Sequence, residues 1–164
     1  MTTAPAIRML VLDVDGVLTD GRLPFDAQGS VAKTFYVQDG AALACWRQAG
    51  GALALISGRR SEATTRRAEE LGAASVEQGV ADKIAAFRNL CERQAVDPRA
   101  CCFVGDDWPD LGPMNACGYP IAVANAIPAV KRAAAYVTRR AGGGGAVAEV
   151  VEHLMRRLGR WPPG

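Results

Sequence analysis

The chain has 164 residues, 49% of them hydrophobic, which is enough for one domain with a buried core and too few for two ordinary domains. Its 19 basic and 17 acidic residues leave a formal net charge of +2, which argues against nucleic acid or an anionic membrane as a partner. No apolar run approaches the length of a membrane span, and the residues before Ile7 lack the charged and apolar regions of a signal peptide.

Five cysteines are present, an odd number without C-x-x-C spacing, and most lie among apolar neighbours. This usage predicts reduced thiols in the core of a cytoplasmic protein. The cysteines are Cys45, Cys91, Cys101, Cys102 and Cys117. We expect a single domain over residues 1–164.

Short apolar runs alternate with longer amphipathic segments along the whole chain. The runs predicted to form strands are residues 7–13, 52–57, 73–77, 101–105, 120–124 and 135–138. The segments predicted to form helices are residues 40–49, 62–71, 80–94, 110–117, 128–134 and 145–158. Asp39 is a candidate N-cap of the first helix, Gly72 follows the second, and Pro128 suits a first helical turn. The alternation predicts a doubly wound, mostly parallel α/β sheet of Rossmann-like type, with helices on both faces.

The first predicted strand runs directly into Asp13 and Asp15, which are followed by Gly16. Because side chains alternate along a strand, both carboxylates project to the same side as the chain leaves the sheet. Two like charges held this close need a cation or a shared proton. With the hydroxyl of Thr19 nearby, the turn fits a metal-assisted attack on phosphate, and its alternative is a solvated turn after an ordinary strand.

Residues 21–38 interrupt the alternation of strands and helices. Apolar and aromatic residues flank a turn sequence at residues 26–29, which predicts a β-hairpin projecting from the carboxyl end of the first strand. A hairpin there could shade the site. Its aromatic residues Phe25, Phe35 and Tyr36 could serve a subunit interface or pack within the chain.

The second and third candidate site elements follow the next strands. Ser57 and Gly58 end an apolar run, where a hydroxyl and an unobstructed N–H can bind phosphate. Lys83 could neutralise phosphate charge. Taken singly both signals are weak, because serine is common at helix starts and a lone lysine is usually a surface residue.

The fourth predicted strand ends in three carboxylates, Asp106, Asp107 and Asp110. They suit a magnesium site, whereas an acidic helix start would account for Asp110 but poorly for the two residues beside the sheet. Since parallel strands end at one edge of the sheet, the four elements are predicted to converge there.

Three further features are not part of these motifs. The glycines at 142–145 indicate either a flexible hinge or a close backbone approach to an anion. His153, on the last predicted helix, is expected to be structural or exposed. Trp46 and Trp108 are predicted to pack, and the alternative for Trp108 is a place at the edge of the pocket.

Taken in order, the motifs resemble those of the haloacid dehalogenase-like phosphohydrolases. The matching residues are the run DVDGV at 13–17, Ser57, Lys83 and the run GDDWPD at 105–110. The sequence is also similar to the 3-deoxy-D-manno-octulosonate 8-phosphate phosphatase subfamily, which acts in lipopolysaccharide biosynthesis. The segments that carry this resemblance are DVDGVLTDG at 13–21, DGAAL at 39–43, ISGRR at 56–60, GVADK at 79–83 and AGGGGAVAEV at 141–150. It covers nearly the whole chain.

The resemblance implies a role for each carboxylate. Asp13 would be the nucleophile that forms an aspartyl-phosphate, and Asp15 would be the general acid and then the general base. Mg²⁺ would be bound by the carboxylates of Asp13 and Asp106 and by the backbone carbonyl of Asp15. Asp107 and Asp110 would orient the water ligands of the metal.

The resemblance also implies the phosphate and sugar contacts. Ser57, the Gly58 amide and Lys83 would hold the phosphate opposite the metal. Sugar selectivity would depend on residues 36–40, which include Gln38, Asp39 and Gly40, and on Arg59 and Arg67.

Members of the subfamily typically carry Asn and Arg where this chain has Tyr36 and Gln38, and Ala44 fills another arginine position. Each missing guanidinium group removes a bidentate partner for a sugar carboxylate. The implied substrate is therefore 3-deoxy-D-manno-octulosonate 8-phosphate, a related nonulosonate 9-phosphate, or a different small phosphorylated sugar.

The subfamily lacks a separate cap domain, and its members assemble as tetramers in which hairpins pair and a neighbour's C-terminal segment covers the site. The resemblance thus implies a homotetramer without a cap.

Two other functions remain open. A receiver-type signalling domain also combines a doubly wound sheet with clustered aspartates, a hydroxyl and a lysine, but an acid/base at Asp15 would shorten the lifetime of its signal. A non-catalytic binding protein on the same scaffold is the third interpretation, and the retention of every expected catalytic residue type argues against it.

Overall fold

A parallel sheet dominates the computed structural model, which describes residues 6–29 and 31–161. Within these residues the sheet has six strands in the order β3-β2-β1-β4-β5-β6, and every neighbouring pair is parallel. The strands are β1 (Met9–Leu12), β2 (Ala52–Ser57), β3 (Ser75–Gln78), β4 (Cys101–Gly105), β5 (Tyr119–Ala122) and β6 (Tyr136–Val137). The order confirms the doubly wound sheet, because the chain adds strands outward from β1 in one direction and then from β4 in the other.

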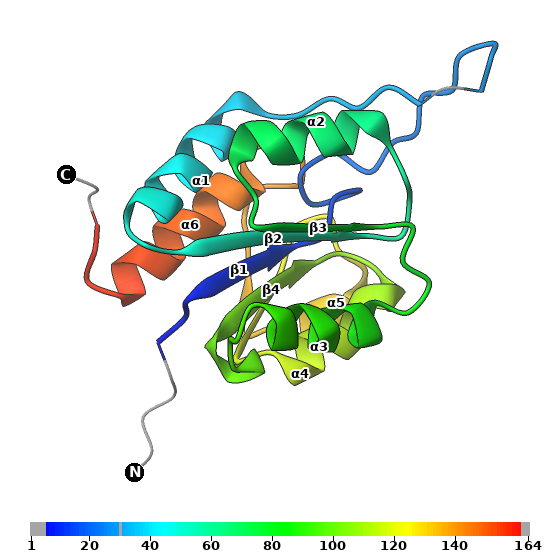
Figure 1. Ribbon diagram of the computed structural model, residues 1–164. Coiled ribbons are helices and arrows are strands. Elements are labelled where there is room, and N and C mark those ends of the chain that lie inside the picture. The colour runs from blue at the N-terminus through cyan, green and yellow to red at the C-terminus, as the bar shows by residue number, and fades with distance from the viewer. Residues whose placement is uncertain (1–5, 30, 162–164) are drawn as a thin grey trace.

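Helices cover both faces of this sheet (Figure 1). Those in the described part of the chain are α1 (Val37–Gln48), α2 (Glu62–Leu71), α3 (Lys83–Arg93), α4 (Leu111–Ala116), α5 (Pro128–Ala133) and α6 (Ala146–Arg157). Helices α1, α2 and α6 lie on one face, with α1 packed along α6, and α3, α4 and α5 lie on the other. None of the helices within residues 6–29 and 31–161 is long and apolar enough to cross a membrane.

The central strands are apolar because both faces of the sheet are covered. All four residues of β1 are fully buried, as are Cys101 to Val104 in β4. Trp46 is also buried, and its indole N–H donates to the carbonyl of Ala52 at 2.8 Å, which confirms the predicted packing. Trp108 contradicts its prediction, since it is 66% exposed on a short 3-10 turn beyond the end of β4.

The five cysteines are free thiols, as predicted, and three of them are buried. Cys91 and Cys101 lie with their sulfur atoms 3.7 Å apart. His153 has the expected structural role, because its ring stacks on Tyr136 and its Nε2 is hydrogen-bonded to the hydroxyl of Tyr119 at 2.9 Å.

Helix starts differ from the predictions where capping groups decide them. Helix α1 begins at Val37, so Asp39 lies within the first turn and is not the predicted N-cap, a position that Tyr36 occupies. Burial against α6 draws the Asp39 carboxylate to that helix instead, where it accepts a hydrogen bond from the Ala148 N–H at 2.8 Å. Helix α3 begins at Lys83 because the Asp82 side chain accepts hydrogen bonds from two N–H groups of the first turn.

Residues 22–29 and 31–36 are here called the arm, whose tip extends beyond the body of the fold and whose second half runs back along α2 to α1 (Figure 1). The predicted hairpin is reduced to one isolated antiparallel bridge between Phe25 and Val31, without regular strands in the described residues. A two-stranded ribbon with no third strand to pair with is only marginally stable, which explains the irregular backbone. Ser30 falls outside the described residues, and Phe25 is 64% exposed.

Candidate active site

The strand order reverses between β1 and β4, and in doubly wound sheets the crevice at the carboxyl ends of such strands is where ligands bind. Asp13 directly follows β1, and its N–H donates to the carbonyl of Val104 in β4 at 3.1 Å. Asp106 directly follows β4, while Ser57 is the last residue of β2. The predicted convergence at this edge, here called the carboxyl edge, is therefore present in the fold.

Three carboxylates meet at the carboxyl edge. Asp13, Asp106 and Asp110 each offer an oxygen atom, and these oxygens lie within 4.8 Å of one another. The ammonium group of Lys83 donates to Oδ1 of Asp13 at 2.6 Å and to Oδ1 of Asp110 at 2.7 Å. Lys83 has a side-chain exposure of only 6%, so it belongs to the site and is not a surface lysine.

Asp110 holds the fourth motif together. Its Oδ2 accepts hydrogen bonds from the N–H groups of Asp106 at 2.9 Å and Asp107 at 3.2 Å. Asp107 itself is exposed, and its carboxylate accepts from the Trp108 N–H at 2.8 Å as a local cap. The structure thus brings Asp106 and Asp110 into the cluster and leaves Asp107 at its border.

The turn after β1 depends on Gly16. This residue has φ +98°, and a Cβ added to it would lie 2.0 Å from Oδ2 of Asp106, so a larger residue would displace the carboxylate. The hydroxyl of Thr19 accepts hydrogen bonds from the N–H groups of Gly16 and Gly21, both at 3.2 Å. Thr19 is 3% exposed, so its hydroxyl closes the turn and does not face an open site.

Burial changes the electrostatics of the cluster. Desolvation and the neighbouring Asp110 raise the pKa of Asp13 to about 6, against the opposing effect of Lys83. Desolvation, Asp13 and Asp110 raise the pKa of Asp106 to about 8. Burial alone would lower the pKa of Lys83, but its contacts with Asp13 and Asp110 hold it above the ordinary value. The site therefore carries more negative charge than its one bridging lysine neutralises.

The glycine-rich segment before α6 packs against the turn after β1. A Cβ at Gly142 would lie 1.9 Å from the carbonyl oxygen of Gly16, so these backbones touch. Asn125 bridges them, donating from Nδ2 to the Gly16 carbonyl at 2.9 Å and accepting from the Gly142 N–H at 2.7 Å. The sequence analysis did not single out Asn125, and no local pattern marks it.

The predicted phosphate-binding residues of the second motif lie beside the cluster. Ser57 is 1% exposed and its Oγ accepts a hydrogen bond from the Arg59 N–H at 3.3 Å. The Val80 N–H donates to the carbonyl of Ser57 at 3.1 Å, which brings the turn preceding Lys83 next to the end of β2. Gly58 and Arg59 are exposed at the same edge.

The predicted sugar-binding residues other than Arg59 form a second group around the start of α1. Arg67 donates to Glu70 at 2.7 Å and lies over the ring of Phe35 at 5.5 Å, and a Cβ at Gly40 would lie 2.7 Å from its Nη2. Gln38 accepts a long hydrogen bond of 3.4 Å from Arg140. Among the described residues no hydrogen bond joins this group to the aspartate cluster.

Lys33 is a site residue that the sequence analysis missed. Its side chain is 3% exposed, and its ammonium group forms an ion pair with Asp15. The composition could have pointed to this residue, since only three of the 19 basic residues are lysines and the other 16 are arginines. Two of those three lysines, Lys33 and Lys83, are buried against site carboxylates.

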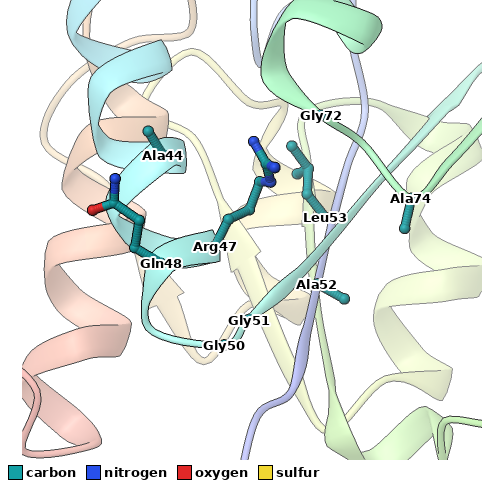
Figure 2. Close-up of a pocket in the computed structure, with 9 residues that line it drawn as sticks. All are labelled: Ala44, Arg47, Gln48, Gly50, Gly51, Ala52, Leu53, Gly72 and Ala74. Carbon is teal, nitrogen blue, oxygen red and sulfur yellow. The ribbon is translucent and has the colours of Figure 1, made fainter.

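A cavity of about 480 Å³ lies at the opposite, amino edge of the sheet (Figure 2). It is lined by Ala44, Arg47, Gln48, Gly50, Gly51, Ala52, Leu53, Gly72 and Ala74. Arg47 extends across it and donates to the carbonyl of Leu71 at 3.0 Å, at the C-terminal end of α2. Its lining holds no carboxylate and lies at the start of β2, so this cavity is not the catalytic centre.

Comparison with known proteins agrees with this geometry. Residues 73–151 match the family described as haloacid dehalogenase-like hydrolase. The 3-deoxy-D-manno-octulosonate 8-phosphate phosphatase KdsC of Salmonella typhi is 40% identical over 160 residues, which cover 98% of this chain and 85% of that protein. The protein of the same name from Escherichia coli K12 is 40% identical over 157 residues, covering 96% and 84%. This chain belongs to that family of phosphatases.

Solved structures of the family share the fold. The phosphatase of this name from Moraxella catarrhalis, in complex with a magnesium ion, a phosphate ion and a KDO molecule, has a TM-score of 0.93 and 37% identity, covering 96% of this chain and 91% of that one. The cobalt-bound phosphatase of Haemophilus influenzae has a TM-score of 0.91 and 36% identity, covering 94% and 91%. The predicted family and fold are thus confirmed.

Proposed function

We propose that this phosphatase hydrolyses the phosphate monoester of a small acidic sugar in a reaction that requires Mg²⁺. The favoured substrate is 3-deoxy-D-manno-octulosonate 8-phosphate, with a related nonulosonate 9-phosphate next. The observation that carries the proposal is the close approach of buried Asp13 and half-buried Asp106 at the strand reversal, with Lys83 hydrogen-bonded to Asp13. The relatives named above, with their magnesium or cobalt and their sugar, support it.

The charges at the carboxyl edge fit a divalent cation. The carboxylates of Asp13 and Asp106, with the backbone carbonyl of Asp15, would hold the ion, and Oδ1 of Asp106 is buried without a hydrogen-bond partner in the described part of the chain. The formal charge is −2, from four carboxylates and two ammonium groups: Asp13, Asp15, Asp106, Asp110, Lys33 and Lys83. Oxygen ligands of this kind suit Mg²⁺, which when bound would neutralise phosphate charge.

In the first step Asp13 attacks phosphorus. A bond forms between its carboxylate oxygen and phosphorus while the bond from phosphorus to the sugar oxygen breaks, and Asp15, which enters this step in its protonated form, gives that oxygen its proton. Water then attacks the aspartyl-phosphate, and Asp15 takes the proton of the water. Inorganic phosphate leaves, and both aspartates return to their starting state.

Ser57, the Gly58 amide and Lys83 hold the phosphate in this proposal. The Ser57 hydroxyl and the exposed Gly58 lie at the end of β2, beside the turn that carries Lys83. Because the charge of the transferring group spreads over its equatorial oxygens, donors fixed in place before the substrate arrives stabilise it. Asp110 keeps Lys83 in position through its 2.7 Å hydrogen bond.

Arg59 and Arg67 are the proposed partners of the sugar carboxylate. Arg59 is exposed at the carboxyl edge. The side chain of Arg67 is 14% exposed, and its Nε has no hydrogen-bond partner in the described residues. Gln38 and Gly40 would shape the same subsite, whereas Asp39 would support it indirectly by holding the start of α6. A different small phosphorylated sugar is the alternative substrate, because Tyr36, Gln38 and Ala44 differ from the residues typical of the subfamily.

We further propose a cytoplasmic homotetramer in which arms of neighbouring chains pair. The exposed Phe25 and the single bridge of the arm support this assembly, and the five free thiols support the compartment. Light scattering is expected to give a mass near four times 17.3 kDa. A mass of one chain would contradict the assembly.

A screen of sugar phosphates tests the activity. With Mg²⁺, inorganic phosphate should be released fastest from octulosonate 8-phosphate or a sialic-acid-type 9-phosphate, and chelation of the metal should stop the release. Stable phosphoprotein without turnover would instead favour the receiver-type domain. Release of phosphate from none of the esters, with no phosphoprotein formed, would favour the non-catalytic binding protein.

A further inference from the structure

Lys33 lies on the exposed arm, yet its side chain is turned into the site. Its neighbours Ala32 and Thr34 are exposed, whereas the Lys33 side chain is 3% exposed. Its ammonium group contacts Oδ1 of Asp15, 18 positions earlier in the chain. The contact is therefore a tertiary one between the arm and the catalytic turn.

Burial of this lysine requires a specific partner. Removing an ammonium group from water is unfavourable, and a carboxylate in contact with it offsets that cost. Asp15 is that partner in the described part of the chain, and its own side chain is 19% exposed. One side of the Asp15 carboxylate thus faces a buried cation, and the residue remains open to solvent and to substrate.

A lysine at position 33 contacts a carboxylate with a different geometry from that of an arginine. A guanidinium group would engage both oxygens of a carboxylate, whereas an ammonium group is a compact charge that can bind one. Lys33 engages Oδ1 of Asp15, which leaves Oδ2 for another hydrogen bond. Lys83 serves Asp13 in a similar way from α3, so the two ammonium groups are divided between the two catalytic aspartates.

We propose that Lys33 is a positioning residue that holds the Asp15 carboxylate so that its second oxygen meets the sugar oxygen leaving phosphorus. The proposal rests on the proposed function, in which Asp15 gives that oxygen its proton. It also makes the arm part of the catalytic machinery, because withdrawal of the arm would release Asp15 from its place beside Asp13.

The leaving group of the ester provides the test. Single-turnover rates are measured for octulosonate 8-phosphate, whose alkoxide needs a proton to leave, and for p-nitrophenyl phosphate, whose phenolate does not. For Lys33→Met the rate on the sugar ester is expected to fall about 10- to 100-fold, while the rate on the nitrophenyl ester and both KM values change less than about threefold. Lys33→Arg should retain more of the sugar-ester rate. Lys131→Met, which changes the third lysine of the chain, should match the wild type.

Two results would overturn the proposal. One is a wild-type rate on the sugar ester in Lys33→Met, and the other is an equal loss on both esters, which indicates a general structural role. Circular dichroism checks the fold, and if Lys33→Met does not fold, the same comparison of esters in Lys33→Arg decides. A wild-type protein that releases phosphate from neither ester would instead refute the proposed function itself.

Discussion

At the carboxyl edge of the sheet, ionisable groups are buried and packed closely, whereas the amino edge holds an open cavity of about 480 Å³ lined mainly by small side chains. Asp106 approaches Gly16 so closely that a single methyl group would overlap it. At the amino edge, Arg47 crosses the cavity and binds a helix carbonyl. A cavity does not by itself mark the site, because strand reversal, loops and charge determine where a doubly wound sheet performs chemistry.

Substitution of the proposed nucleophile tests this contrast most strongly. Asp13→Asn is expected to lower phosphate release by about 10⁴-fold or more while the protein stays folded, because the amide has no charged oxygen to attack phosphorus. Arg47→Met, at the amino edge, should leave the rate within about twofold and serves as the matched control. Steady-state phosphate release and circular dichroism provide the readouts. Normal activity in Asp13→Asn would exclude it as the nucleophile.

Removal of Lys83 should destabilise the whole molecule. Lys83→Met leaves Asp13 and Asp110 buried without their cation, and breaking a buried pair in this way costs about 3–5 kcal/mol. Urea unfolding at pH 8 measures the loss, with Lys131→Met as the control for removal of a lysine. A loss below about 1 kcal/mol would show that the cluster does not need this ammonium group.

Gly16→Ala should reduce both stability and activity. The new Cβ would lie 2.0 Å from Oδ2 of Asp106, and the backbone has φ +98°, so a cost of about 2–3 kcal/mol is expected. Gly29→Ala is the matched control, because Gly29 has φ +79° and no atom within 4 Å of the added Cβ. Urea unfolding and phosphate release are measured for both variants. Equal effects of the two substitutions would show that the contact with Asp106 is unimportant.

Substitution of Asp39 should have an effect on stability that depends on pH. Burial raises its pKa from 3.8 to about 6, so the folded protein binds this proton more tightly than the unfolded chain does. Its contribution to stability is complete below pH 4 and is lost as the pH rises through 6. In Asp39→Asn, which keeps an acceptor for the Ala148 N–H, this loss of about 3 kcal/mol should disappear. Urea unfolding from pH 4 to 8 measures the difference, and parallel curves for the two proteins would contradict it.

The sheet and the positions of the clustered aspartates could be predicted because they depend on local patterns. Apolar runs predict buried strands, and Asp13, Ser57 and Asp106 come directly after or at the end of such runs. The prediction of a regular β-hairpin was wrong, since only one bridge forms. Pairing between strands depends on neighbours that the local sequence does not specify. The predicted packing of Trp108 was wrong because the burial of this side chain depends on what packs over the turn.

By itself, the sequence determined the order of strands and helices, the edge at which they end and the residue types placed there, since burial and capping act over a few residues. The tertiary structure decided which side chains meet. Examples are Lys33 with Asp15, Asp39 with the start of α6, and Asn125 between two backbones. These partners lie 18 to 109 positions apart. Their meeting depends on the packing of whole elements, which short-range patterns do not encode.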